Sequence, residues 1–410
     1  MTSPAARTTS PGRRTLALGV FLPVVVFETG LGAILPVVAL TAVDLGADVA
    51  TAGVVVALLA VGQILGDVPA GAIAARFGDR RAMLGASVAA VLALTAAALA
   101  PSVVVLGLSL LALGAINAVF MLARHSYLTE TTPVMRRARM LSTLGGLQRV
   151  GTFIGPFVGA GVIHLTGLRG VYWLAVGTSV VTAAIVALVP DVDHRRPAGP
   201  RVPTWHVLRD HRQVLWTLGL GVLMVGAVRG SRQTVLPLWS EHLGLAPATT
   251  SIVFGIAGAV DMLLFYPAGR LMDRRGRLWT AIPSMLVLGA GFLALPFTTG
   301  FASITAVAMV IGLGNGMGAG ILMTLGADVA PPTGRAQFLG LWRLCQDAGG
   351  AAGPLLVAGG AAVGSLAAGI WAVGGVGVAS AGVLARWAPR WSVHASGATR
   401  RRAREAGLLD

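Results

Sequence analysis

The sequence contains no lysine, a single cysteine and few charged residues of either sign. Its 31 basic residues are all arginine, and charged residues make up only 11% of the 410 residues. A soluble domain needs many more charges to cover its surface, so this composition argues against a soluble protein. The lone Cys345 excludes an internal disulfide and argues against a cysteine metal cluster. Without lysine there is no phosphate-binding loop of the G-x-x-x-x-G-K type, which excludes an ATP-driven pump of that kind.

Apolar residues make up 55% of the chain, and its mean hydropathy is +0.79. A helix needs about 20 mostly apolar residues to cross the hydrocarbon core of a bilayer. Runs of about this length recur along almost the whole chain and leave no long hydrophilic stretch for a separate soluble domain. They predict an all-α membrane protein with twelve transmembrane helices, at residues 15–42, 50–74, 82–100, 103–126, 139–165, 170–190, 213–239, 247–271, 278–298, 302–326, 337–360 and 364–386.

The first apolar run follows Arg13 and Arg14, an arrangement that also occurs in secretory signals. The run continues past Glu28 to about Ala42, and no small-residue cleavage site ends it early. We therefore interpret it as the first membrane span and not as a cleaved signal.

The formal net charge is +15, a value that in a soluble protein would suggest binding to nucleic acid. Here the arginines gather in alternate connections, near residues 7–14, 80–81, 136–139, 195–212, 274–277, 335 and 400–404. Cytoplasmic loops of membrane proteins carry an excess of basic residues. The pattern therefore predicts a multi-pass protein of a bacterial inner membrane with both termini in the cytoplasm, and it makes nucleic acid an unsuitable partner.

A shift of 198 positions aligns the two halves of the sequence without a gap over several distant stretches. Each half has six predicted spans, an even number, so the two copies share one orientation in the membrane. The sequence thus predicts an N-terminal six-helix bundle at 1–190, a cytoplasmic linker at 191–212, a C-terminal six-helix bundle at 213–387 and a basic cytoplasmic tail at 388–410. Matched pairs include Gly114 with Gly312, Asn117 with Asn315, Gln148 with Gln346, Gly151 with Gly349, and Gly155-Pro156 with Gly353-Pro354.

A charged loop motif follows span 8, with the pattern Gly269-x-x-x-Asp273-Arg274-x-Gly276-Arg277. A glycine in such a motif allows helices to approach closely. The aspartate and the arginines can form a latch between helices at the predicted cytoplasmic end, so we expect this loop to take part in gating.

The first-half copy of this motif is Gly71-x-x-x-Ala75-Arg76-x-Gly78, in which Ala75 replaces the acid. We expect Asp67 or Asp79 to supply the acid instead. The motif, its position after the second span of each half, the repeat and the span count together resemble the major facilitator superfamily over nearly the whole chain. The resemblance implies a transporter of two pseudo-symmetric bundles, usually monomeric.

Span 5 carries the pattern Gly151-x-x-x-Gly155-Pro156-x-x-Gly159. Glycines at this spacing form a smooth face for close packing, and Pro156 bends the helix. The pattern resembles the motif of the drug/proton antiporter branch of the superfamily. Antiporters of that branch carry an arginine in span 4, four residues before its central glycine, but here Leu110 occupies this position, which argues against proton coupling.

Charged residues inside a span are costly in hydrocarbon and tend to face a bundle interior or an aqueous cavity. Spans 3, 6, 9 and 12 have none in their interiors. In the fold that the resemblance implies, these four helices lie outside, and spans 1, 4, 7 and 10 line the cavity with spans 2, 5, 8 and 11 beside them. The charges that we expect at the cavity are Glu28, Arg149, Arg229, Arg232, Asp261, Arg343 and Asp347.

Glu28, near the middle of span 1, is our first candidate for the proton carrier, with Arg149 as its expected partner. A buried carboxylate beside an arginine can load and release a proton near neutral pH. Asp347 is the second candidate, although Arg343 lies four residues earlier on the same helix face, so an ion pair within that helix is an alternative.

Asp261 is a third candidate, and we expect it to pair with Arg229 or Arg232. For every one of these charged groups, a static salt bridge between helices is the alternative to a role in transport. Amide side chains that either bind substrate or hydrogen-bond between helices are Asn117, Gln148, Asn315 and Gln346.

These patterns favour a secondary active transporter that exports a small organic compound or drug in exchange for protons by alternating access. A symporter or facilitator that imports a metabolite is the alternative, and Leu110 favours it. A membrane enzyme or sensor is disfavoured, because the sequence offers no catalytic constellation and no appended soluble domain. No cofactor and no metal are expected. The expected partners are the small-molecule substrate, protons and the lipid bilayer.

Overall fold

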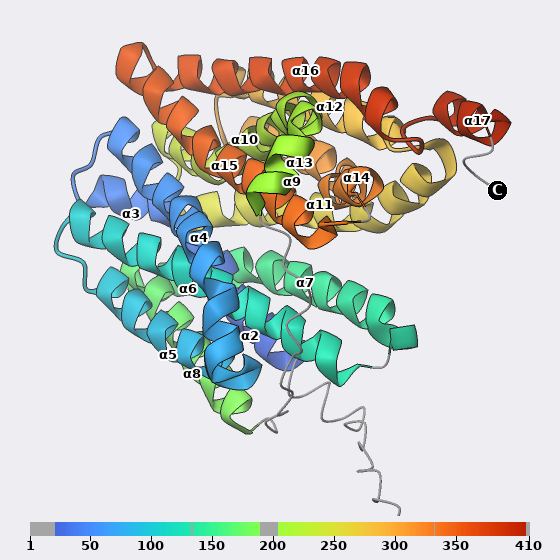
Figure 1. Cartoon of the computed structure of the whole chain (residues 1–410). Coiled ribbons are helices and arrows are strands. Elements are labelled where there is room, and N and C mark those ends of the chain that lie inside the picture. Colours follow the sequence, from blue (N-terminus) through green and yellow to red (C-terminus); the bar gives the residue numbers. More distant parts are fainter. Residues whose placement is uncertain (1–20, 133, 189–203, 332, 407–410) are drawn as a thin grey trace, which may run out of the picture.

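The computed structural model of the protein describes residues 21–132, 134–188, 204–331 and 333–406, which form helices joined by short connections (Figure 1). Residues 15–20 of the predicted first span, 191–203 of the predicted linker and 407–410 of the predicted tail lie outside the described residues.

The helices of the first half are α2 (Leu22–Ile34), α3 (Val38–Asp44), α4 (Val49–Phe77), α5 (Asp79–Ala98), α6 (Val103–Thr131), α7 (Val134–Thr166) and α8 (Leu168–Leu188). Those that follow are α9 (Thr204–Asp210), α10 (Arg212–His242), α11 (Pro247–Arg275), α12 (Leu278–Ala294), the 3-10 turn η2 (Leu295–Phe297), α13 (Phe301–Met317), α14 (Ile321–Val329), α15 (Arg335–Val363), α16 (Leu366–Trp391) and α17 (Gly397–Glu405). The helix α16 runs past the predicted end of the second bundle at residue 387.

Nine spans within the described residues are long and apolar enough to cross a membrane, and the bent pair of α2 and α3 makes a tenth. Each of the twelve predicted spans coincides with one helix or with two consecutive ones. The two that are not among these ten are α7 and α15, which are 33 and 29 residues long and carry charged residues near their middles. The chain is therefore an all-α, multi-pass membrane protein, as predicted.

Two predicted spans are broken in the structure, and neither break was expected from the sequence. The first span bends by 41° between α2 and α3, where Pro36 lies. Proline has no N–H to donate and its ring clashes with the preceding turn, which favours a kink or a break at this point. The tenth span is interrupted between α13 and α14, where Gly320 has a φ of +78°, a backbone conformation that favours glycine.

The two halves lie side by side, the N-terminal half from blue to green and the C-terminal half from yellow-green to red (Figure 1). Each half is built around its own buried apolar cluster. The helix pairing also repeats, because α2 packs on α7 and α4 on α6 in the first half, while α10 packs on α15 and α11 on α13 in the second. The repeat seen in the sequence is thus a repeat of packing.

Glycine faces bring two helices of each half into backbone contact. A Cβ atom added at Gly155 of α7 would lie 2.5 Å from the backbone nitrogen of Ala33 of α2. A Cβ atom at the matched Gly353 of α15 would lie 2.1 Å from the carbonyl oxygen of Ala227 of α10. The structure confirms that the glycines of span 5 form a face for close packing, and the second half uses its copy in the same way.

The loop-motif glycines Gly78 and Gly276 end α4 and α11 at equivalent places. Their φ angles are +84° and +106°, in the region that side chains rarely adopt. The N–H groups of both residues donate to the carbonyl four residues earlier, which closes the last turn of each helix. These two glycines are therefore required by the backbone.

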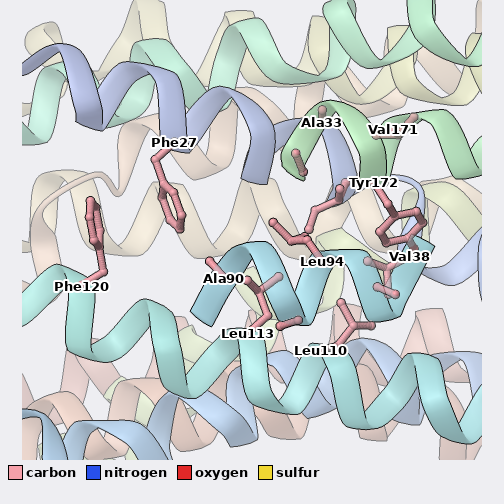
Figure 2. Close-up of a cluster of buried hydrophobic side chains, with 14 of the residues drawn as sticks. Phe27, Ala33, Val38, Ala90, Leu94, Leu110, Leu113, Phe120, Val171 and Tyr172 are labelled. Carbon is pink, nitrogen blue, oxygen red and sulfur yellow. The ribbon is translucent and has the colours of Figure 1, made fainter. Parts of the chain in front are cut away.

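An apolar cluster fills the centre of the N-terminal half (Figure 2). Phe27 of α2 stacks on Phe120 of α6, with ring centroids 4.8 Å apart. Leu110 of α6 belongs to this cluster and is fully buried. The position at which the antiporter branch carries an arginine is therefore part of an apolar core in this protein.

The two halves touch at the end of the molecule opposite to the Arg-rich connections, which we call the closed end. There, near the start of α4, a Cβ atom added at Gly53 would lie 2.9 Å from the Cβ atom of Ala358 in α15. A Cβ atom at Gly255 of α11 would lie 2.8 Å from the ring of Phe157 of α7. Small residues thus let α4 meet α15, and α11 meet α7, across the interface between the halves.

Candidate transport site

Glu28 lies in the middle of α2 and forms a buried ion pair with Arg124 of α6. Arg124 Nη1 lies 3.4 Å from Glu28 Oε1, and the two side chains are 0% and 3% exposed. Arg124 Nη2 donates to Gln148 Oε1 of α7 over 3.3 Å. The guanidinium also lies 5.7 Å from the ring centroid of Phe120. This pair lies wholly within the N-terminal half.

The prediction that Arg149 is the partner of Glu28 is wrong. Arg149 Nη1 instead lies 3.8 Å from Asp261 Oδ1 of α11, in the other half. Consecutive helical residues point about 100° apart, so Gln148 faces Arg124 inside its own half while Arg149 faces the interface. Arg124 lies two residues before the end of the predicted span 4 at residue 126, but α6 continues to Thr131. Arg124 follows Leu110 by about four helical turns on one face, which was an available signal.

Asp261 is the centre of a second charged cluster. Asn315 Nδ2 of α13 donates to Asp261 Oδ2 over 2.6 Å, and Arg232 Nη1 of α10 lies 3.5 Å from the same oxygen. Arg229 Nη2, one helical turn before Arg232, donates to the backbone oxygen of Asn315 over 3.4 Å. With Arg149 from the first half, the cluster combines three guanidiniums with one carboxylate. The predicted pairing of Asp261 with Arg232 is confirmed.

A third charged cluster joins α4 of the first half to α15 of the second. Arg343 Nη2 lies 3.8 Å from Asp67 Oδ1, and Arg343 Nε lies 3.3 Å from Asp347 Oδ2. The carboxylates of Asp67 and Asp347 thus share one guanidinium. The ion pair between Arg343 and Asp347 is thus present, but it forms part of a three-membered group that spans the interface.

Asp67 is one of the two acids that we expected to complete the first-half loop motif, and it pairs with Arg343 of the opposite half. Asp67 lies about three helical turns before the end of α4 and contacts the other half, which span boundaries alone did not reveal. Asp79, the alternative acid, accepts a hydrogen bond from Ser126 Oγ of α6. Arg76 lies with its guanidinium 5.5 Å from the ring centroid of its neighbour Phe77.

The second-half loop motif forms a latch through Arg277. Its Nε and Nη2 atoms donate to the two carboxylate oxygens of Asp328 of α14, over 3.0 and 3.3 Å. Its Nη1 atom donates to Asp273 Oδ1 over 3.4 Å. Arg274, by contrast, is exposed at the surface. The latch that the motif predicted is therefore present, and it connects elements of a single half.

Gly269 and Gly71 do not provide the close helix approach that we expected of them. A Cβ atom at Gly269 would meet nothing within 4 Å, and one at Gly71 would meet only Leu122 at 3.9 Å. Among the described helices, no other helix packs closely against α4 at Gly71 or against α11 at Gly269. The close contacts of these two helices lie at other positions along them.

The matched asparagines have different environments. Asn315 contacts Asp261, whereas Asn117 Nδ2 lies 3.8 Å from Met121 Sδ on its own helix. Within the part of the chain that the structure describes, Asn117 Oδ1 is buried and accepts no hydrogen bond. Gln346 is partly buried on α15, where its backbone oxygen packs against Gly226 of α10.

The three clusters differ in their access to solvent. The side chains of Arg149, Asp67 and Arg343 are 35%, 33% and 42% exposed, although each contacts the opposite half. Their accessible surface therefore lies along the interface between the halves. The pair of Glu28 and Arg124, in contrast, is enclosed within one half. The interface clusters therefore contain more exposed side chains than this pair does.

The fold, the repeat and the charged interface agree with the family comparison. The family model of the Major Facilitator Superfamily matches residues 20–354. The chain belongs to this superfamily of membrane transporters, as its sequence motifs indicated.

Curated relatives are similar over parts of the chain. A protein of Yersinia pestis (strain Pestoides F) named "Multidrug resistance protein MdtH" is 26% identical over 288 residues, which cover 69% of this chain and 71% of the relative. A protein of the same strain named "Uncharacterized MFS-type transporter" is 26% identical over 173 residues, or 42% of this chain. The chain spans less than half of that relative, 44% of its length.

Solved structures share the fold at low sequence identity. A mutant of the nucleoside transporter NupG has a TM-score of 0.72 at 13% identity, with 90% of this chain and 100% of that chain covered. A D-xylose-proton symporter has a TM-score of 0.67 at 16% identity, with 90% and 95% covered. At such identities the likeness shows the fold alone, and the substrate must be inferred from the residues of this chain.

Proposed function

We propose that this protein is a secondary active transporter that exports a small organic compound in exchange for protons. The observation that carries the proposal is the contact of Arg343 with Asp67 of the opposite half and Asp347 of its own helix. The relative named as a multidrug resistance protein supports the choice of an organic compound as substrate and of export as direction.

A proton can drive alternating access only if it binds the two conformations with different affinity. Asp67 and Arg343 belong to different halves, so any movement that separates α4 from α15 breaks their ion pair. Protonation of Asp67 removes its negative charge and weakens the attraction across the interface. Proton binding and separation of the halves therefore favour one another, which is the coupling that an antiporter needs.

Glu28 is the second candidate for the coupling group. Its partner Arg124 lies in the same half, so a rigid movement of one half against the other leaves this pair intact. The Glu28 carboxylate is also enclosed in this conformation. In our proposal Asp67 and Asp347 carry the coupling, and Glu28 with Arg124 stabilises the N-terminal half.

The orientation that we propose is compatible with export. The excess of arginine in alternate connections places the Arg-rich end in the cytoplasm. The closed end then faces outward, and the interface clusters are accessible from the cytoplasm. An exporter loads its substrate in this conformation.

The test uses purified protein in proteoliposomes with an imposed pH gradient and a pH-sensitive dye inside. Anionic, neutral and cationic aromatic compounds are added in turn, and compound-dependent proton flux is recorded. We expect flux with a subset of compounds, its loss in Asp67→Asn and in Asp347→Asn, and its retention in Glu28→Gln. Asp44→Asn is the matched control, because Asp44 is exposed at the end of α3 and belongs to none of the three charged clusters.

Other outcomes would change the proposal in defined ways. Compound movement without proton flux would make the protein a facilitator. Flux that disappears only in Glu28→Gln would assign the coupling to the buried pair. Accumulation of compound together with protons would support the importing symporter that Leu110 favoured, and would contradict export.

Alternating access itself is testable at the closed end. Gly53→Cys and Ala358→Cys, in a Cys345→Ala background, place two thiols where the Cβ atoms lie 2.9 Å apart. A disulfide needs about 3.5–4.5 Å between Cβ atoms, so a shift of roughly 1 Å suffices. We expect oxidation to stop transport and reduction to restore it, with either single cysteine variant as control. Full transport by the oxidised, cross-linked protein would contradict a cycle that opens this end.

A further inference from the structure

We propose that the cluster around Asp261 is the substrate subsite and that it binds the negatively charged group of an organic anion. This inference rests on the proposed transport function and adds to it the chemical class of the substrate. Arg149 and Arg232 contact the carboxylate of Asp261, and Arg229 lies beside them on the backbone oxygen of Asn315. These three guanidiniums and one carboxylate carry a formal charge of +2. An excess of cationic groups inside a membrane protein is costly, and a bound anion would offset it.

Arg229 gives the strongest evidence for a bound ligand. It forms no ion pair within 4 Å in the part of the chain that the structure describes, and its contact is the backbone oxygen of Asn315 at 3.4 Å. Among the same described residues, its Nε atom is buried without a hydrogen-bond acceptor. Nη1 of Arg232 is buried too and makes no hydrogen bond, although it lies 3.5 Å from Asp261 Oδ2. Buried guanidinium N–H groups without acceptors cost free energy. The carboxylate, sulfonate or phosphate of a ligand supplies acceptor oxygens to two guanidiniums at once.

The surroundings of the cluster indicate an aromatic or apolar body on the same ligand. The guanidinium of Arg232 lies 5.3 Å from the ring centroid of Phe254. Phe153, one helical turn from Arg149 on the same face of α7, lies against Gly258 of α11 on the side of the closed end. Phe153 stacks edge to face with Phe157, ring centroids 5.3 Å apart. A solute that reaches the arginines from the Arg-rich end therefore meets an aromatic wall behind them.

The net charge of the third cluster distinguishes it from the proposed anion site. Asp67, Asp347 and Arg343 combine two carboxylates with one guanidinium, so their formal charge is −1. The two groups of opposite net charge thus lie on different helices of one interface. The positive group lies on α7, α10 and α11, and the negative group lies on α4 and α15. The sequence alone left both charge signs open for the substrate. The structure separates an anion-binding group from a proton-binding group.

The experiment measures binding, which needs no gradient and no transport. Purified full-length protein in detergent at low ionic strength is titrated with benzoate, benzenesulfonate, benzyl alcohol and benzyltrimethylammonium, and Kd is obtained from thermal stabilisation. We expect the two anions to bind and the neutral and cationic analogues to bind at least about tenfold more weakly. Arg229→Gln is expected to raise the Kd of benzoate about tenfold. Arg270→Gln, at an exposed site of α11 beside Tyr266, is the matched control.

Asp261→Asn distinguishes a ligand site from a structural salt bridge. The Asp261 carboxylate competes with a ligand for the same guanidiniums, so its neutralisation is expected to lower the Kd of benzoate at least about threefold. A structural role alone predicts lower stability and no gain in affinity. If Arg229→Gln does not fold, this variant and the selectivity of the wild-type protein decide the question.

The proposal is overturned if benzyltrimethylammonium binds more tightly than benzoate, or if folded Arg229→Gln and Asp261→Asn leave the Kd of benzoate unchanged. The proposed transport function fails separately. Anion binding without proton flux would contradict proton coupling but not the anion site. Proton flux coupled to cations alone would contradict the anion site but not proton coupling.

Discussion

The two halves share helix pairing and glycine contacts, but they use their intramembrane charges differently. In the first half, Glu28 and Arg124 neutralise one another inside the bundle, at 3% and 0% exposure. In the second half, Asp261 collects guanidiniums from α10 and, through Arg149, from the opposite half. One half thus has a closed, neutral pair, and the other contributes to an open, positively charged cluster at the interface.

The difference arises at positions that the repeat relates. Asn117 and Asn315 are equivalent, but the residue equivalent to Asp261 in the first half is Gln63. Because Gln63 carries no charge, Asn117 contacts the sulfur of Met121 and not a carboxylate. The two halves therefore share a backbone arrangement, and a few polar differences at matched positions give one half a buried ion pair and the other a charged cluster at the interface.

The largest expected effect breaks the neutral pair of the first half. Arg124→Met leaves Glu28 buried without its partner, which costs about 3–5 kcal/mol of unfolding free energy. In the second half, Arg232→Met should cost no more than about 1 kcal/mol, because Asp261 keeps Asn315 and Arg149 and is partly exposed. Unfolding in mixed micelles measures both values. The double variant Glu28→Met with Arg124→Met should recover most of the loss, and equal losses in the two single variants would contradict the comparison.

The next effect tests what the halves have in common. Gly155→Ala and Gly353→Ala each place a Cβ atom against backbone, at 2.5 and 2.1 Å, and should each cost about 1–3 kcal/mol. Gly161→Ala and Gly359→Ala on the same two helices are matched controls, because a Cβ atom there meets nothing within 4 Å. We expect the controls to stay within about 0.5 kcal/mol of the parent protein. A large difference between the two halves would show that their packing is not equivalent.

The smallest effect sharpens the contrast at the matched asparagines. Asn315→Ala removes the 2.6 Å hydrogen bond to Asp261 and should cost about 1.5 kcal/mol. Asn117→Ala removes only a 3.8 Å contact with sulfur and should cost about 0.5 kcal/mol. Both are measured by the same unfolding titration. A reversed order would mean that Asn117 carries the more important interaction.

Much of the fold follows from local sequence. The apolar runs located helices because a bilayer requires about 20 apolar residues per span. Charged positions in the spans were also visible, since such residues are rare in hydrocarbon. The breaks at Pro36 and Gly320 were not predicted, because the surrounding runs stay apolar on both sides of each break.

The pairing of charges was predicted only in part. Arg232 was one of the two partners expected for Asp261, and it is the one that forms the ion pair. The ion pair of Arg343 with Asp347, expected as an alternative to a proton-carrying role, is also present. Arg149 was assigned to Glu28, but the direction in which a helix residue points depends on rotation about the helix axis, which span boundaries do not give. Asp67 was missed at the interface for the same reason.

The sequence by itself determined the membrane class, the repeat and the superfamily, because these depend on hydropathy, spacing and motif residues along one chain. Only the tertiary structure decided which charges meet. An ion pair needs its atoms within about 4 Å, and Arg149 with Asp261, or Asp67 with Arg343, come that close only when the two halves pack together. The separation of a buried neutral pair from two charged interface clusters is therefore a property of the packed molecule.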